Sequence, residues 1–131
     1  MDIKNSIRQI AEKALKAARD LAHASTEDKN DVLLKMAQEL LAKSDFLIKE
    51  NAKDLRQAKK SGLSAAMIDR LTLKEATIEA MAQGLREVAA LPDPVGKITS
   101  MWRRPNGLLV GRMRIPLGVI GIIYESRPNV T

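Results

Sequence analysis

The stretch PLGVIGIIYESRPNVT, residues 116–131, decides how the rest of the chain is interpreted, because an apolar run meets a polar cluster within it. Residues 119–123, Val-Ile-Gly-Ile-Ile, show no alternation of apolar and polar types. That pattern is typical of a strand covered on both faces. Ligands of open α/β sheets collect beyond the carboxyl ends of the strands, so the polar residues that follow are candidate site residues.

This polar cluster offers a carboxylate, a hydroxyl, a guanidinium and an amide, from Glu125, Ser126, Arg127 and Asn129. The Arg127 guanidinium could hold a phosphate or a carboxylate with two parallel hydrogen bonds. A polar loop is also what ordinarily follows an apolar strand. The residue types alone therefore leave both interpretations open.

Composition excludes several classes of site. The 131 residues are 45% apolar and 29% charged, which is typical of one globular domain. The absence of cysteine excludes disulfides and a cysteine nucleophile within this chain, and His23 alone cannot form a metal site. No apolar run approaches the roughly 18 residues of a membrane span, and residues 1–6 lack the apolar region that a secretory signal contains. We therefore expect a cytoplasmic protein without a membrane partner.

Charge divides the chain near residues 91–94, Leu-Pro-Asp-Pro. Residues 1–94 hold 16 basic and 15 acidic residues, whereas residues 95–131 hold six basic residues and one acidic residue. The basic segment could contact another subunit or a nucleic acid. Stacking aromatic residues are nearly absent and the first segment is nearly neutral, so nucleic-acid binding is disfavoured.

Apolar spacing predicts four to five amphipathic helices before residue 94. Ser25–Asp28, Ser44 and Ser64 are expected near helix starts, and Gly62 after a helix end. Thr72 with Glu75 has the spacing of a capping box. The core should be aliphatic, since only three residues are aromatic: Phe46, Trp102 and Tyr124.

After residues 91–94, apolar and polar residues alternate with the two-residue period of β-strands. Arg104-Pro105-Asn106-Gly107 predicts a turn, with Gly107 at positive φ. Extended residues flank it, with Arg112 and Arg114 on a cationic face and the remaining alternate residues on an apolar face: Leu109, Met113 and Ile115. Trp102 is equally compatible with an interface anchor and with packing under the hairpin.

Several ordered blocks resemble the gamma-glutamyl phosphate reductase family of the aldehyde dehydrogenase superfamily. They are NAKDL at residues 51–55, GLSAAMIDRL at 62–71, LPDPVG at 91–96 and RIPLGVIGIIYESRPNVT at 114–131. The resemblance implies an α/β aldehyde-dehydrogenase-like fold, of which this portion is mainly helical. Residues 1–94 would be the helical part of the cofactor-binding domain, 95–117 a hairpin arm, and 118–131 the first strand of the nucleotide-binding sheet with an active-site loop, in an incomplete domain.

The same resemblance implies an activity for a longer protein. Members of the family reduce L-glutamyl 5-phosphate with NADPH, in proline biosynthesis, to L-glutamate 5-semialdehyde and phosphate through a cysteine thioester. The family's cysteine lies beyond residue 131, so this chain contains no catalytic residue and is expected to be inactive alone. The alternative is a non-catalytic helical module for interaction or oligomerisation.

Site residues follow from the resemblance position by position. Aligned without gaps, Arg127 occupies the place of the superfamily's oxyanion-binding asparagine, whereas a shift of the loop by two residues would put Asn129 there. We expect Arg127 to contact the acyl phosphate, assisted by Ser126 or Asn129. Tyr124 and Glu125 match positions that approach the cofactor. Residues 97–116 match a hairpin that reaches a neighbouring subunit, which implies a homo-oligomer.

Overall fold

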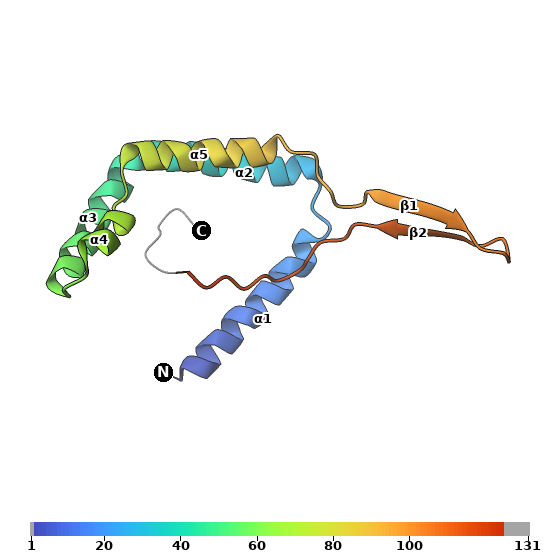
Figure 1. Ribbon diagram of the computed structural model, residues 1–131, viewed down its shortest axis with the longest axis horizontal. Helices are drawn as coiled ribbons and strands as arrows, with labels where there is room; N and C mark the ends of the chain where they lie inside the picture. Colours follow the sequence, from blue (N-terminus) through green and yellow to red (C-terminus); the bar gives the residue numbers. More distant parts are fainter. Residues whose placement is uncertain (1, 125–131) are drawn as a thin grey trace. The chain divides into compact units, whose positions relative to one another are not determined.

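The computed structural model describes residues 2–124 and contains, within that range, five helices followed by a two-stranded antiparallel hairpin (Figure 1). The predicted helices and hairpin are thus confirmed. In chain order the elements are α1 (Ile3–Leu21), α2 (Thr26–Ala42), α3 (Ser44–Lys60), α4 (Ala65–Leu71), α5 (Glu75–Ala89), β1 (Ile98–Arg103) and β2 (Leu109–Met113). They divide between two compact units: residues up to 26 with 92–121, and residues 27–91 with 122–124.

The first unit begins with α1, whose apolar stripe is at the surface. The Asp2 carboxylate caps the helix by accepting a hydrogen bond of 3.1 Å from the Lys4 N–H. None of the residues of α1 is buried, and the side chains of Ile3, Ile7 and Ile10 are all exposed. Because such a stripe is stabilised by contact with another apolar surface, α1 has the character of a helix that packs on further protein.

The second unit is built from the helices α2 to α5. Helix α3 packs against α4 and against α5. The buried apolar residues of the described chain all lie here: Ala37, Ala58, Ile78 and Ala82. This confirms the predicted aliphatic core, in which Ile78 is the large side chain that is fully buried.

Two of the predicted helix boundaries are confirmed by their hydrogen bonds. The Ser64 Oγ accepts a hydrogen bond of 3.4 Å from the Met67 N–H at the start of α4. Gly62, with φ of 72°, follows the end of α3, and the next amide, Leu63 N–H, donates to the Ala58 carbonyl at 3.1 Å. Glycine is favoured there because the left-handed backbone crowds a Cβ.

The predicted capping box of Thr72 and Glu75 is wrong. Lys74 is the N-cap of α5, and Thr72 is instead the C-cap of α4. The Thr72 hydroxyl donates a hydrogen bond of 2.7 Å to the Ile68 carbonyl of the preceding helix. Threonine side chains can bond backward to such carbonyls as well as cap forward, and sequence spacing does not distinguish the two.

A buried amide holds the connection between α4 and α5. Asn51, on α3, is 7% exposed, and its Nδ2 donates to the Leu71 carbonyl at 2.9 Å. Its Oδ1 accepts from the Leu73 N–H at 2.8 Å. One side chain therefore satisfies a donor and an acceptor that the end of α4 leaves without helical partners.

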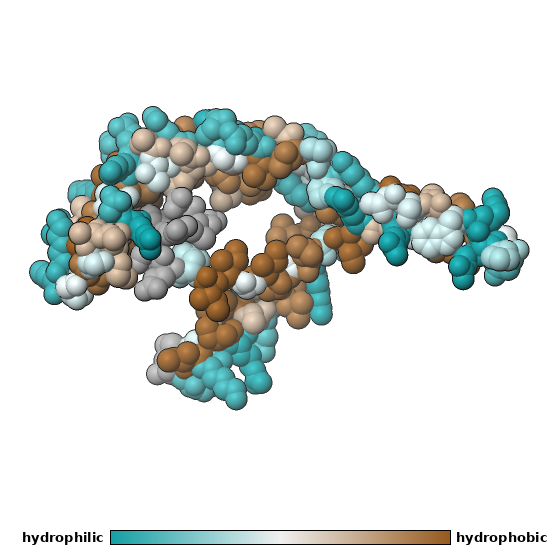
Figure 2. Space-filling view, in the orientation of Figure 1, coloured by the Kyte–Doolittle hydropathy of each residue, from teal (hydrophilic) through white to brown (hydrophobic). Residues whose placement is uncertain are grey.

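Among residues 2–124, no helix combines the length and the hydropathy that crossing a membrane requires. The apolar character of the segment after β2 is nevertheless plain at the surface (Figure 2). The exposed residues there include Ile115, Leu117, Ile120 and Ile122.

Candidate functional site

The residues expected to bind substrate and cofactor lie almost entirely outside the described part of the chain. Ser126, Arg127 and Asn129, expected at the substrate, and Glu125, expected at the cofactor, all lie beyond residue 124. Tyr124 is described, and its side chain is half exposed. The predicted phosphate contact of Arg127 therefore stays a prediction.

The segment before Tyr124 does not form a strand in the structure. Residues 118–124 carry no ladder, and Val119, Ile120 and Ile123 are exposed. A strand is defined by hydrogen bonds to a neighbour, and a lone extended segment cannot supply them. That this segment becomes an interior member of a sheet stays a prediction, and its exposed apolar side chains are compatible with it.

The hairpin is the candidate functional element that the structure describes best. Its turn is closed by the Gly107 N–H, which donates to the Arg104 carbonyl at 2.9 Å, and by the Arg104 N–H, which donates to the Leu108 carbonyl at 2.8 Å. Gly107 has φ of 87°, as the sequence predicts. The Asn106 Oδ1 also accepts from the Leu108 N–H at 3.2 Å, so local hydrogen bonds fix the tip.

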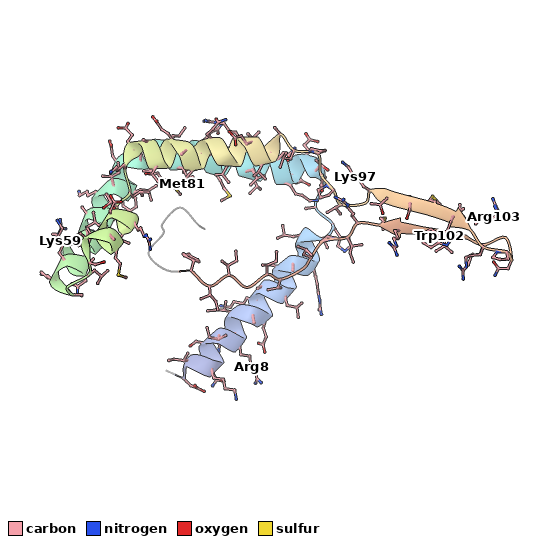
Figure 3. The ribbon with its side chains drawn as sticks, viewed as in Figure 1. Arg8, Lys59, Met81, Lys97, Trp102 and Arg103 are labelled. Atoms are coloured by element: carbon pink, nitrogen blue, oxygen red, sulfur yellow. The ribbon has the colours of Figure 1, made fainter. Side chains whose placement is uncertain are left out.

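The ladder of the hairpin is antiparallel with one bulge. Trp102 pairs with Val110 and Arg103 with Leu109, whereas the register shifts between Ile98 and Ser100 and leaves Thr99 as the extra residue. Hydrogen bonding continues below the strands, where the Gly96 N–H donates to the Arg114 carbonyl at 2.9 Å. Lys97 marks this root of the hairpin and Arg103 lies toward the tip (Figure 3).

The two faces of the hairpin follow from this register. Ile98, Met101, Leu109 and Met113 share one face, where the missing side chain of Gly111 leaves room: a Cβ there would lie 3.3 Å from the Met101 Cγ. Ser100, Trp102, Val110 and Arg112 share the opposite face. Every residue of both strands except Val110 is exposed, so neither face is covered by the described residues.

The predicted separation into an apolar and a cationic face is right for Leu109, Met113 and Arg112 but incomplete. In β1, Trp102 lies on the same face as Arg112, and Arg103 lies on the same face as Leu109. The Arg103 Nη1 donates to the Gly107 carbonyl at 2.9 Å, which draws this side chain back onto the turn. Prediction of each strand from its own alternation misses such mixing, because pairing between strands decides which residues meet.

Electrostatically the hairpin has no neutralising charge of its own. Residues 95–124 contain five basic residues and no acidic residue: Lys97, Arg103, Arg104, Arg112 and Arg114. Clustered cations with exposed apolar neighbours suit a partner surface that offers both carboxylates and apolar area. Within residues 2–124 no group of His, Cys, Asp or Glu is arranged to hold a metal ion.

Sequence reasoning missed the role of Asp93 at the root of the hairpin. Its Oδ1 accepts from the Val95 N–H at 2.9 Å and its Oδ2 accepts from the Thr26 hydroxyl at 3.0 Å. The first contact has a local signal, since aspartate often bonds the amide two residues on. The second joins residues 67 apart in the sequence, for which the sequence carries no signal.

Comparison with known proteins bears directly on this combination of helices and basic hairpin. No family model matches the chain. The chain is 61% identical over its full 131 residues to gamma-glutamyl phosphate reductase of Geobacter metallireducens, and 58% identical to that of Geotalea daltonii. The chain is a homologue of gamma-glutamyl phosphate reductase.

This homology covers a portion of each reductase. The chain spans 31% of the length of the curated relatives it matches. Crystal structures of gamma-glutamyl phosphate reductases agree with its fold: that from Thermotoga maritima has a TM-score of 0.86 at 38% identity, covering 92% of this chain and 29% of that one. The enzyme from Saccharomyces cerevisiae gives the same TM-score and identity, covering 93% and 31%.

Proposed function

We propose that this chain is the N-terminal portion of a gamma-glutamyl phosphate reductase. The longer enzyme would reduce L-glutamyl 5-phosphate with NADPH to L-glutamate 5-semialdehyde and phosphate, in the cytoplasm, as a step of proline biosynthesis. The observation that carries the proposal is identity of 61% and 58% along the entire chain with reductases of that name, joined to the matching fold.

We propose further that these 131 residues alone do not catalyse the reaction. An acyl-enzyme requires a thiolate nucleophile, and the chain contains no cysteine. A dinucleotide site requires backbone amides at a helix N-terminus beside a sheet. Of the residues expected to approach the cofactor, the described part of the chain supplies Tyr124 alone.

Arg127 is the residue to which we assign substrate recognition in the longer enzyme. A guanidinium matches the charge and geometry of an acyl phosphate better than an amide does. Ser126 or Asn129 would add a hydrogen bond at the same group. The assignment rests on the sequence positions of these residues.

The assay that tests these proposals measures NADPH oxidation in the presence of L-glutamyl 5-phosphate. The 131-residue chain is expected to give the rate of a protein-free control, and any faster rate would show that catalysis does not need a cysteine from elsewhere. In the longer enzyme, Arg127→Ala should lower kcat or raise KM by about tenfold or more. Arg8→Ala, an exposed arginine of α1, is the matched control and should leave both constants unchanged.

The hairpin is proposed to be the arm that contacts a second copy of the chain. Its support is the exposure of both faces, including Met101 and Leu109, together with five cations that no acidic residue of the same segment neutralises. Sedimentation equilibrium tests this. Met101→Asp places a charge on the apolar face and should weaken association by at least tenfold, whereas Glu79→Gln on exposed helix surface should not.

A non-catalytic interaction module is the second candidate. The observation in its favour is that the described residues form a defined hairpin with exposed faces but no substrate site. Stable oligomers formed by the 131-residue chain without ligand, together with an inactive longer protein, would favour this candidate. Steeply salt-dependent binding to DNA would instead point to the nucleic-acid interpretation.

A further inference from the structure

The hairpin begins at a short segment whose backbone has few donors of its own. Residues 92–94 are Pro-Asp-Pro, so the prolines on either side of Asp93 supply no N–H. Gly96 then takes φ of 81° and begins the ladder, with its N–H on the Arg114 carbonyl. The Lys97 N–H donates back to the Pro94 carbonyl at 3.2 Å. The hydrogen bonds at the root of the hairpin thus begin within four residues of Asp93.

The two carboxylate oxygens of Asp93 bond to different parts of this unit. Oδ1 accepts from the Val95 N–H at 2.9 Å and fixes the segment that leads to the ladder. Oδ2 accepts from the Thr26 hydroxyl at 3.0 Å, which lies 67 residues earlier in the chain, at the first residue of α2. Asp93 is half-buried and its hydrogen bond to the Val95 N–H is partly buried, whereas its hydrogen bond to the Thr26 hydroxyl is exposed.

We infer that Asp93 is a latch that holds the root of the hairpin to Thr26 and so restricts the motion of the whole arm. An isolated two-stranded hairpin is marginally stable in water. Because both faces of β1 and β2 are exposed, packing orders the hairpin little. Contacts at its root therefore contribute more to holding it in place. Hydrogen bonds to a charged carboxylate are stronger than hydrogen bonds between neutral groups. A single aspartate can therefore hold the root of the hairpin.

A competing interpretation is that the Thr26 contact serves only α2. A carboxylate near a helix N-terminus stabilises the helix through its dipole. Helix α2 already carries Glu27 and Asp28 in its first turn, so it does not depend on Asp93 for that charge. The two interpretations differ in what loosens when the contact is removed: the hairpin root in the first case, the first turn of α2 in the second.

Thr26→Val tests the latch in the 131-residue chain, because valine keeps the shape of threonine and leaves the bond between Asp93 and Val95 in place. Two signals report on the arm: amide hydrogen exchange at Gly96 and Arg114, and the anisotropy decay of Trp102, the only tryptophan of the chain. We expect exchange at both amides to rise by about fivefold or more, the effect of one hydrogen bond. The slow component of the Trp102 anisotropy should decrease in amplitude.

Two further variants make the result specific. Thr26→Ser restores the hydroxyl and should restore both signals. Thr72→Val is the matched control, because it also removes one threonine hydrogen bond, to the Ile68 carbonyl at 2.7 Å, in the other unit. It should leave Gly96, Arg114 and Trp102 unchanged.

Unchanged root amides and unchanged Trp102 anisotropy in Thr26→Val would overturn the latch. So would faster exchange confined to the first turn of α2. Measurements at a concentration where the chain is monomeric keep the latch separate from assembly, whose dependence on Asp93 rests on the proposed function. If Met101→Asp leaves association intact, the arm proposal fails while the latch stands. If Met101→Asp dissociates the oligomer but Thr26→Val leaves the root unchanged, the latch alone fails.

Discussion

The region around Asn51 and the β1–β2 hairpin both satisfy their backbone groups, but in different surroundings. Asn51 is 7% exposed and its two hydrogen bonds join α3 to the α4–α5 connection, in the unit that also contains the buried Ile78 and Ala82. The hairpin forms a ladder with one bulge and a closed turn, yet almost all of its residues are exposed. Hydrogen bonds alone contribute little net stability in water, so the first region can order itself whereas the second needs a covering surface.

Ile78→Ala should give the largest loss of stability, and it should destabilise the helical core but not the hairpin. Removing a fully buried branched side chain costs about 2–5 kcal/mol of unfolding free energy, through lost burial and the cavity left behind. Urea unfolding followed by far-ultraviolet circular dichroism measures it. Val88→Ala, on the exposed part of the same helix, is the control, with an expected change below about 0.5 kcal/mol.

Trp102 fluorescence, recorded in the same titration, sharpens the result. If the hairpin unfolds independently of the helical core, Ile78→Ala should shift the helical transition seen by circular dichroism but not the transition seen by Trp102 fluorescence. A Trp102 transition that moves together with the helical one would show instead that the helical core and the hairpin unfold as a single unit.

Asn51→Ala should destabilise the helical unit by about 1–3 kcal/mol, because the Leu71 carbonyl and the Leu73 N–H lose their partner in a half-buried place. Differential scanning calorimetry measures the change. Gln83→Ala removes an exposed amide whose hydrogen bond to Glu87 is 3.1 Å long, and it should change stability by less than about 0.5 kcal/mol. Equal effects of the two variants would mean that the Asn51 bonds do not hold the connection.

Two glycine substitutions should act in opposite directions. Gly107→Ala forces a Cβ into a backbone with φ of 87°, which costs roughly 1–2 kcal/mol and should reduce the cross-strand contacts of the hairpin seen by NMR. Gly84→Ala lies inside α5, where an added Cβ meets nothing within 4 Å, and should stabilise the helix by roughly 0.5–1 kcal/mol. Loss of helical stability in Gly84→Ala, or an unaltered hairpin in Gly107→Ala, would contradict this.

The smallest predicted effect concerns an exposed ion pair. The Lys43 ammonium, 2.7 Å from the Glu39 carboxylate, lowers the pKa of Glu39 through a hydrogen bond and through its charge. A lowered folded-state pKa means that the pair stabilises the fold above the ordinary glutamate pKa of 4.5 and loses that contribution as the pH falls through the folded value. Lys43→Met should raise the pKa of Glu39 in an NMR titration; an unchanged value would remove Lys43 as the cause.

Local signals in the sequence predicted much of this architecture. The serine cap of α4, the glycine after α3 and the Pro-Asn-Gly turn each depend on residues within four positions, and each is confirmed. The Thr72 capping box failed because a threonine can bond either of two adjacent helices. The mixed faces of the hairpin and the contact of Asp93 with Thr26 depend on which distant segments meet, which no local pattern encodes.

The candidate site, too, has features that the sequence predicts and features that depend on tertiary structure. The basic, exposed hairpin was predicted from charge and alternation, and the family from ordered blocks of residues, in agreement with relatives that match the chain along its whole length. The roles of Arg127 and its neighbours depend on a pocket whose remaining walls would come from segments outside residues 2–124. Chemistry of that kind is assembled by tertiary structure, so residue types identify its candidates but not its geometry.

Amide hydrogen exchange of the 131-residue chain, resolved by residue and repeated at a low and a high protein concentration, tests the central claim most directly. The claim is that the helical core is ordered by its own burial and that the hairpin, held at its root within one chain, gains further order from the second copy proposed above. We predict strong, concentration-independent protection at Ile78 and Ala82, and protection at Trp102 and Val110 that is weaker at the lower concentration and increases at the higher one. Hairpin amides that are equally well protected at both concentrations would contradict the claim.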